Sequence, residues 1–405
     1  MLEQPDKGLT VSPVNFSQDF SLTGPFLCNK RRTVPAELSD FKNHNRLMSA
    51  AGGTMFRVDV DAHIDESEAT WEYLDDGARR FKPVTLDPGA ATVPGDARPH
   101  RLWLIDGTIR LRRWRDDKRT GTVRATRELL DVEARVRHMD ELHVDVQVLY
   151  PTLFLHAFTA RPEIDVALCK SYNRWIAKAT DKSRGRLRWV AVLPLLNIDK
   201  AVEEVRWAKD HGACGVFKKG IECGDRAASD PYFFPVYEEA SRLDLPICIH
   251  NATGNVESAT AEGSGLGGGM VAIAAFSALV EHGVPDLFPK LRVGFIETGA
   301  SWIPYLYADL VAKKLRRTFL PIDFKEDLFR RYRFYVACQT NDDLPYILKY
   351  GTEDSLMIGT DYSHADQSAE MQALDVIEQR AEKGEIPASV ARKILDDNPR
   401  RFYGL

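Results

Sequence analysis

The sequence lacks the features that mark nucleic-acid-binding and membrane proteins. Its 405 residues include 54 Lys and Arg against 59 Asp and Glu, a formal net charge of −5. This balance provides no basic surface for nucleic acid or for an anionic membrane. No apolar run approaches the length of a membrane span, and the N-terminus has no charged segment followed by an apolar one. We therefore expect a cytoplasmic protein that binds neither nucleic acid nor a membrane.

Cysteine is also scarce, and no two cysteines form a CxxC pair. The six are Cys28, Cys169, Cys214, Cys223, Cys248 and Cys338. Cys214 and Cys248 lie within short apolar runs, which is typical of buried thiols. This usage excludes a disulfide scaffold and predicts reduced cysteines, in agreement with a cytoplasmic location.

What the sequence does contain is a regular alternation of short apolar runs with helical patterns from residue 55 onward. The runs predicted as strands are 56–61, 144–150, 188–193, 213–217, 246–250, 291–296, 333–337 and 355–360. Helices are predicted over 126–142, 163–181, 199–211, 232–243, 270–282, 301–316, 342–349, 366–383 and 387–396. Apolar strands separated by helices indicate a parallel sheet that is buried on both faces. Eight of them predict an α/β fold of the (β/α)8 TIM barrel type over residues 55–405.

Two segments lie outside this repeat. Residues 1–54 are predicted to form an N-terminal arm that packs on the barrel or on a partner subunit. Residues 66–125 form an insertion after the first strand, with a hairpin that turns at Asp106-Gly107. An insertion at the catalytic end of a barrel favours a lid over the active site, although a cap that never touches substrate fits the same pattern.

Four ionisable residues at predicted strand ends indicate a metal centre. Asp61 and His63 end the first strand, and because side chains alternate they point to the same side. His250 ends the fifth strand, and Asp361 follows the eighth. Catalytic groups of TIM barrels lie at these strand ends, so we expect the four side chains to meet. Two oxygen and two nitrogen donors suit Zn²⁺, with Mn²⁺ or Fe²⁺ as alternatives. Each residue taken singly has a structural alternative. His250 also fits an imidazole that is hydrogen-bonded to the backbone, and Asp361 also fits the N-cap of the next helix.

Other residues near the strand ends are candidates for proton transfer and substrate binding. Glu297 follows the sixth strand and fits a general acid or base, a ligand of a second metal, or a structural carboxylate. His364 is a second catalytic candidate that fits a ligand-orienting or substrate-donating role. Lys218, His156 and Trp302 are predicted to contact substrate. For Lys218, a carboxylated metal-bridging lysine and a plain solvated lysine remain open. The Gly-rich stretch 262–270 has no P-loop spacing and is interpreted as a loop.

The ordered set of motifs resembles the amidohydrolase-related metal-dependent hydrolases, in the branch of aminocarboxymuconate-semialdehyde decarboxylase and the resorcylate decarboxylases. The motifs are Val58-Asp-Val-Asp-Ala-His63 with Glu66, Val144-Asp-Val-Gln-Val-Leu-Tyr-Pro151, Tyr172-Asn-Arg-Trp175, Leu245-Pro-Ile-Cys-Ile-His250, Ile296-Glu-Thr-Gly-Ala-Ser-Trp302, Gly359-Thr-Asp-Tyr-Ser-His364 and Asn398-Pro-Arg-Arg-Phe-Tyr-Gly404. The resemblance implies that Asp61, His63, His250 and Asp361 are the metal ligands. At the sixth strand, where decarboxylases of this branch carry a catalytic histidine, this chain has Glu297. Neither the arm nor the insertion is covered by the resemblance.

These observations predict a metal-dependent enzyme that acts on a small carboxylic acid, by hydrolysis or by non-oxidative decarboxylation, with Glu297 moving the proton. A second hypothesis is one subunit of an oxygen-activating Fe or Mn monooxygenase, similar to 2-aminoisobutyrate hydroxylase. A third is a non-catalytic partner subunit with a structural metal. We expect a homo-oligomer, or a hetero-oligomer with a related subunit.

Overall fold

The computed structural model describes residues 55–86, 101–112, 120–252, 267–324, 327–364 and 368–405. Its central sheet has eight strands in the order β1-β5-β6-β7-β10-β11-β12-β13. They are β1 (Val58–His63), β5 (Val146–Tyr150), β6 (Leu187–Ala191), β7 (Gly215–Lys219), β10 (Ile247–His250), β11 (Val293–Ile296), β12 (Phe334–Cys338) and β13 (Leu356–Ile358). Neighbouring strands in this order are paired in parallel. All eight correspond to predicted strands.

The first and last strands approach each other and nearly close the barrel. The contact runs through the residues that follow β13: His63 N donates to the carbonyl of Tyr362 (2.7 Å), and Asp361 N donates to that of Asp61 (2.8 Å). These bonds join β1 to the segment that carries the predicted ligand Asp361. The predicted TIM barrel is therefore confirmed, and both ends of the sheet meet at the candidate site.

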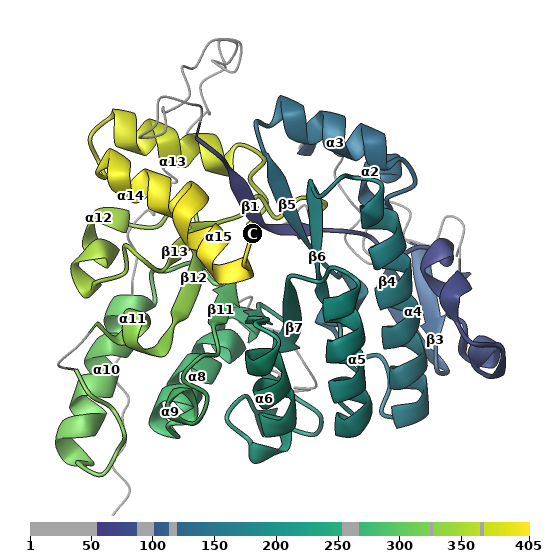
Figure 1. Cartoon of the computed structure of the whole chain (residues 1–405), viewed down its shortest axis with the longest axis horizontal. Coiled ribbons are helices and arrows are strands. Elements are labelled where there is room, and N and C mark those ends of the chain that lie inside the picture. The colour runs from purple at the N-terminus through teal and green to yellow at the C-terminus, as the bar shows by residue number, and fades with distance from the viewer. Residues whose placement is uncertain (1–54, 87–100, 113–119, 253–266, 325–326, 365–367) are drawn as a thin grey trace, which may run out of the picture. The chain divides into compact units, whose positions relative to one another are not determined.

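Helices surround the strands, and the last one lies across the barrel in Figure 1. Their bounds are α2 (Arg124–Arg127), α3 (Val132–Glu141), α4 (Pro162–Asp181), α5 (Ile198–Asp210), α6 (Phe234–Arg242), α8 (Gly267–Glu281), α9 (Val284–Leu287), α10 (Ile303–Arg316), α11 (Leu328–Tyr332), α12 (Leu344–Ile347), α13 (Ala373–Glu382), α14 (Ala388–Arg392) and α15 (Asn398–Tyr403). Tyr403 of α15 reaches into the barrel, where its hydroxyl donates to the carbonyl of Val60 and contacts the hydroxyl of Tyr150 (2.7 Å).

Several helix predictions differ from the structure at breaks in the helical backbone. The helix predicted over 126–142 is two helices, because Leu129 adopts a left-handed backbone (φ 51°) between α2 and α3. The one predicted over 387–396 continues through a π-helix (Lys393–Asp397) into α15. Helix α13 starts at Ala373 instead of 366, and the short helices α9 and α11 had no periodic pattern long enough to predict them.

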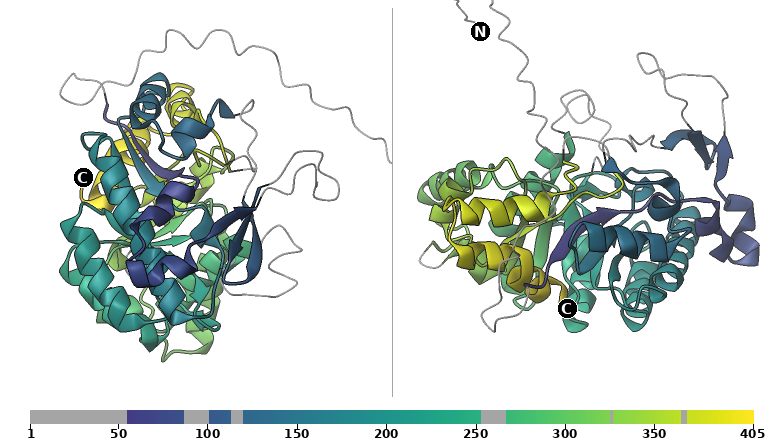
Figure 2. Two further views of the ribbon diagram at one scale, coloured as in Figure 1. Left: turned by 90° about the vertical axis from the view of Figure 1, so that its right-hand side faces the viewer. Right: turned by 90° about the horizontal axis from the view of Figure 1, so that it is seen from above.

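The insertion after β1 contains two 3-10 helices (Glu68–Tyr73 and Asp76–Phe81) and an antiparallel sheet of β2 (Val84–Leu86), β3 (Arg101–Ile105) and β4 (Thr108–Arg112). Figure 2 shows it at one side of the barrel. The predicted hairpin is confirmed, since Asp106 and Gly107 both have positive φ (49° and 74°), as a tight hairpin turn requires. Asp106 accepts hydrogen bonds from Thr159 and Arg161, in the segment that follows β5. The predicted arm, residues 1–54, lies outside the described residues.

The close approach of β13 to β1 depends on Gly359. A Cβ atom added there would lie 2.4 Å from Cβ of Asp61 and 2.7 Å from its backbone nitrogen. We expect Gly359→Ala to lower the free energy of unfolding by about 1–3 kcal/mol, because neither strand can move without breaking the barrel contact. Urea denaturation followed by circular dichroism measures the change. Gly77→Ala is the matched control, since a Cβ there would meet nothing within 4 Å. Equal stability of the two variants would contradict the expectation.

Candidate metal centre

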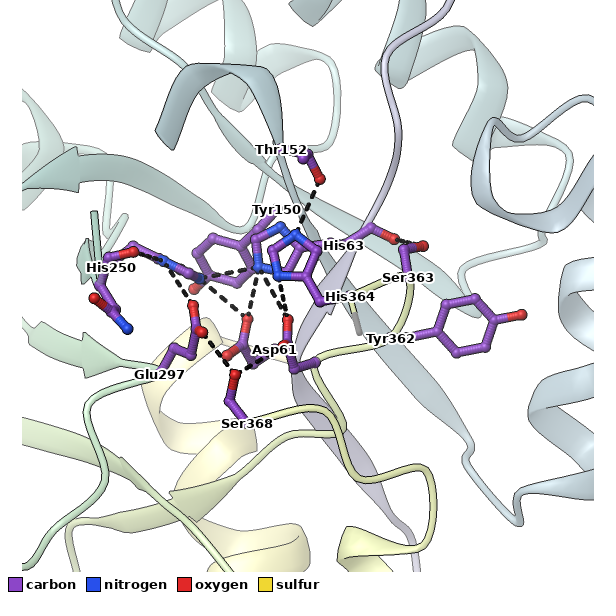
Figure 3. Close-up of polar contacts among 12 residues, drawn as sticks. Asp61, His63, Tyr150, Thr152, His250, Glu297, Tyr362, Ser363, His364 and Ser368 are labelled. Carbon is purple, nitrogen blue, oxygen red and sulfur yellow. Dashed lines mark hydrogen bonds and ion pairs between the residues drawn. The ribbon is translucent and has the colours of Figure 1, made fainter. Parts of the chain in front are cut away.

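Four strand ends bring their ionisable side chains together at the mouth of the barrel. Asp61 and His63 end β1, His250 ends β10, Glu297 follows β11, and Asp361 follows β13. Figure 3 shows the side chains of Asp61, His63, His250 and Glu297 pointing toward one another. Asp61, His63, His250 and Asp361 are almost completely buried. The predicted convergence of the four metal-ligand candidates is thus present in the structure.

The donor atoms are spaced as a divalent metal requires. Asp61 Oδ1 lies 3.4 Å from His63 Nε2 and 3.3 Å from His250 Nε2, and the two Nε2 atoms are 3.1 Å apart. Asp361 Oδ1 lies 3.7 Å from His63 Nε2. Ligands of a tetrahedral Zn²⁺, with bonds of about 2.0–2.2 Å, are about 3.3–3.5 Å from one another. The separations therefore fit a metal held between these residues.

The orientation of both imidazoles supports the same conclusion. Nδ1 of His63 lies 2.9 Å from the carbonyl of Pro151, and Nδ1 of His250 lies 3.0 Å from that of Asn251. A carbonyl can only accept, so each Nδ1 carries the hydrogen, and in the neutral ring Nε2 presents a lone pair. Where both rings are neutral, two lone pairs and a carboxylate oxygen lie within 3.4 Å of each other and repel unless a proton or a metal cation lies between them. This is the arrangement in which backbone carbonyls orient histidine ligands.

The ionisation of these groups also fits a cation site. Burial lowers the pKa of His63 to about 4, which leaves its imidazole neutral at pH 7. Burial opposes ionisation of Asp61, but His250 and His63 outweigh it and hold the pKa of Asp61 below its ordinary range. Burial also lowers the pKa of His250, yet the carboxylates of Asp61 and Glu297 raise it above its usual value. The site holds the ionised carboxylate of Asp61 and attracts positive charge.

Glu297 and Asp361 share a backbone feature that is rare outside glycine. Their φ angles are 57° and 50°, in the left-handed region. Non-glycine residues in this region cost free energy and occur often at functional sites. Here the turn directs both carboxylates back over the barrel, so that Glu297 Oε2 lies 3.5 Å from Nδ1 of His250.

The second catalytic candidate, His364, lies in the same cluster. Its Nδ1 is 2.7 Å from Asp361 Oδ1, and its ring stacks on that of His63 with centroids 3.8 Å apart. Nε2 contacts the hydroxyl of Thr152 at 3.2 Å. His364 thus orients Asp361 and, together with His63, Glu297 and Asp361, forms a second group of potential metal ligands.

Sequence reasoning missed one polar residue of the centre, Ser368. Its hydroxyl lies 2.7 Å from Glu297 Oε1 and 2.9 Å from Asp361 Oδ2, so that it links the two carboxylates. Ser368 lies in the segment before α13, away from any strand end, and no sequence pattern marks it. Thr152, which contacts His364, follows β5 directly and could have been found by the same strand-end rule as the ligands.

A pocket with a cavity volume of about 50 Å³, open to solvent, adjoins the metal centre through Phe217, whose ring centroid is 6.1 Å from that of His250. Its walls come from β7, from α4 and from the segments that follow β5 and β6, among them Phe154, Phe158, Leu193 and Phe217. The predicted substrate contact His156 also lines this pocket.

Lys218 and Trp302, the other two residues predicted to contact substrate, lie outside this pocket. Strand β7 ends at Lys219, and because side chains alternate, Phe217 and Lys219 face the pocket while Lys218 points the other way. Lys218 is buried, donates to Glu222 at 2.6 Å and lies over the ring of Phe233. The indole of Trp302 donates to the carbonyl of Gly299 and packs on Phe276, among the apolar residues behind the barrel. Neither residue lines the pocket.

Glu66 fixes the segment that forms one wall of the pocket. It is buried, and its two carboxylate oxygens accept from the backbone N–H groups of Thr152 (3.1 Å) and Leu153 (2.9 Å). Burial raises the pKa of Glu66 to about 8. The folded protein therefore keeps a proton on Glu66 over a pH range in which the unfolded chain has already released it.

This difference predicts a pH dependence of stability. Between the ordinary pKa of glutamate and about 8, the folded state binds more protons than the unfolded state, so the free energy of unfolding falls as the pH rises. We expect a smaller fall in Glu66→Gln, which has no proton to lose, and an unchanged slope in the exposed control Glu72→Gln. Urea titrations from about pH 5 to about pH 8 measure the slopes. Parallel slopes in wild type and Glu66→Gln would refute the assignment.

Comparison with known proteins agrees with the barrel fold. The chain is 25% identical over 121 residues to a 2-amino-3-carboxymuconate-6-semialdehyde decarboxylase of Dictyostelium discoideum, a match that covers 30% of this chain and 33% of that protein. The amidohydrolase structure from Mycobacterium avium subsp. paratuberculosis superposes with a TM-score of 0.69 at 19% identity, covering 86% of this chain and 98% of that chain. A 5-carboxyvanillate decarboxylase from Novosphingobium aromaticivorans superposes with a TM-score of 0.62 at 18% identity, and the match covers 89% of this chain and 100% of that chain. That structure holds manganese and 3-methoxy-4-hydroxy-5-nitrobenzoic acid.

None of the described helices is long and apolar enough to cross a membrane.

The sequence profile of one family, described as amidohydrolase, matches residues 58–405, which include every candidate ligand and the whole barrel. This match indicates an enzyme of the kind found in that family. The resemblance noted from the motifs is thereby confirmed: the chain belongs to the amidohydrolase family.

Proposed function

We propose that the protein is a metal-dependent enzyme that removes a carboxyl group, without oxidation, from a small carboxylic acid. The observation that carries this proposal is the buried cluster of Asp61, His63 and His250, with lone pairs directed at one point beside a pocket. Two of the relatives described above are decarboxylases by name, and one of them was solved with manganese and an aromatic acid.

Asp61, His63, His250 and Asp361 would hold the metal. When bound, a divalent metal supplies a Lewis acid that binds and polarises substrate oxygens. The mixed oxygen and nitrogen donors suit Zn²⁺ or Mn²⁺, and we propose Zn²⁺ as the first candidate. Ser368 and His364 keep the carboxylate of Asp361 in place, since both contact its oxygens.

Glu297 is the proposed proton-transfer group. In a decarboxylation the C–C bond breaks, CO₂ leaves, and the electron pair left on carbon must be protonated. A protonated Glu297 would donate that proton, with Ser368 orienting its carboxyl group at 2.7 Å. Hydrolysis is the second candidate, because the same carboxylate in its ionised form would accept a proton from attacking water. None of the relatives described above is named as an oxygenase or as a non-catalytic subunit, so these two hypotheses gain no support.

The test is carbon dioxide release. The full-length protein, loaded separately with Zn²⁺ and with Mn²⁺, would be incubated with 5-carboxyvanillate and with simpler aromatic mono- and dicarboxylic acids. We expect metal-dependent CO₂ release from at least one acid, and none after treatment with a chelator. Release of amine or alcohol from amide and ester substrates, without CO₂, would replace decarboxylation by hydrolysis. Absence of both reactions would overturn the proposed function.

A further inference from the structure

Lys219 places a positive charge at the pocket, next to the metal centre. It is the last residue of β7 and the register partner of His250, the last residue of β10. Lys219 and Phe217 lie on the same side of β7, and both line the pocket. The pocket therefore has a cationic group beside one end of the metal site.

The ammonium group of Lys219 has hydrogen-bonding capacity to spare. In the described part of the chain, its hydrogen-bond acceptor is the carbonyl of Phe154, at 3.2 Å. An ammonium group carries three N–H donors, so one carbonyl leaves two without a protein acceptor. Lys219 is only half-buried, and these donors are available to a molecule that enters the pocket.

The two carboxylates of the pocket are engaged elsewhere. Glu222 accepts from the ammonium group of Lys218 at 2.6 Å and from the backbone nitrogen of Lys219 at 3.2 Å. Asp165 accepts from the backbone nitrogen of Leu196 at 3.1 Å, and burial raises its pKa to about 6. Among the described residues, neither forms an ion pair with the ammonium group of Lys219. The positive charge of Lys219 acts on Asp165 across the pocket and lowers its pKa, but its N–H donors are not taken up by either carboxylate and can bind a ligand.

The remaining walls define the body of that ligand. Phe154, Phe158 and Phe217 offer aromatic faces, and Leu193 and Leu195 add apolar surface. Such walls favour a small, flat, apolar body, whereas the ammonium group favours an anionic substituent. A molecule with both features could place one carboxylate at the metal centre and the other at Lys219.

We propose that Lys219 binds a second anionic group of the substrate and so selects flat diacids over monoacids. This inference rests on the proposed function, since it takes the pocket beside the metal centre as the substrate site. Lys219 is a specificity residue in this proposal, and it takes no part in the proton transfer.

Binding of two simple probes tests the proposal without turnover. Isothermal titration calorimetry would compare benzene-1,3-dicarboxylate with benzoate on the full-length, metal-loaded protein. A charge-assisted hydrogen bond to a second carboxylate should make the dicarboxylate bind at least about tenfold more tightly. Lys219→Gln should abolish this preference and leave benzoate affinity within about twofold. Lys219→Arg, which keeps the charge, should retain most of it.

Two further variants separate Lys219 from other cations. Lys200→Gln, which changes an exposed lysine paired with Glu203, should behave as wild type. His156→Gln alters the other basic residue of the pocket and should keep the preference. A wild-type protein without preference, a Lys219→Gln protein that keeps it, or its loss in His156→Gln alone would each overturn the proposal. Because binding is measured, an enzyme that fails to release CO₂ yet prefers the dicarboxylate would refute only the proposed reaction.

Discussion

Replacing His63 with alanine should abolish turnover and remove the metal. His63 is the donor that contacts most of the cluster, with Asp61, His250 and Asp361 all within 3.7 Å of its Nε2 atom. Losing one of about four ligands removes a coordinate bond and leaves a cavity at the centre of a buried charged site. We expect metal affinity to fall by at least about 10²-fold and kcat/KM to fall below detection.

Metal analysis after dialysis, together with activity measured at saturating Zn²⁺ or Mn²⁺, checks this result. The matched control is His282→Ala, because His282 is an exposed histidine directly after α8 whose Nδ1 contacts the carbonyl of Ala278. That variant should keep both metal and activity. If His63→Ala retained stoichiometric metal and normal turnover, the metal centre would have to be located elsewhere in the molecule.

Substituting Glu297 by glutamine should separate proton transfer from metal binding. The amide preserves the size of the side chain and its contact with Ser368, but it has no titratable proton. We expect kcat to fall by about 10²–10⁴-fold, the usual effect of removing a positioned acid or base, with KM and metal content close to those of wild type.

Two other outcomes have clear meanings. A parallel loss of metal and activity in Glu297→Gln would make Glu297 a ligand, in line with its place in both potential ligand groups of the cluster. Normal turnover with full metal loading would show that Glu297 is a structural carboxylate and would end its role in the mechanism. Glu385→Gln, which changes an exposed carboxylate paired with Arg380, controls for the charge change itself.

The order of the elements and most of the ionisable residues that meet at the barrel mouth could be predicted from the sequence itself. Buried parallel strands must be short apolar runs, and helices between them must be amphipathic, so the eight strands could be placed from composition and period alone. Asp61, His63, His250 and Glu297 could be predicted because a parallel barrel brings the C-terminal ends of all its strands to one rim, whatever the intervening sequence.

The tertiary structure decided which side chains at that rim face inward. Lys218 and Lys219 are adjacent and chemically identical, and a strand that ends two residues later than predicted, at Lys219, puts Lys219 into the pocket and Lys218 against Glu222. Ser368 reaches the centre from a segment that was predicted to be helical but lies before the start of α13. Local sequence fixes the period of an element, but its end point and the path of a loop depend on contacts with residues distant in the chain.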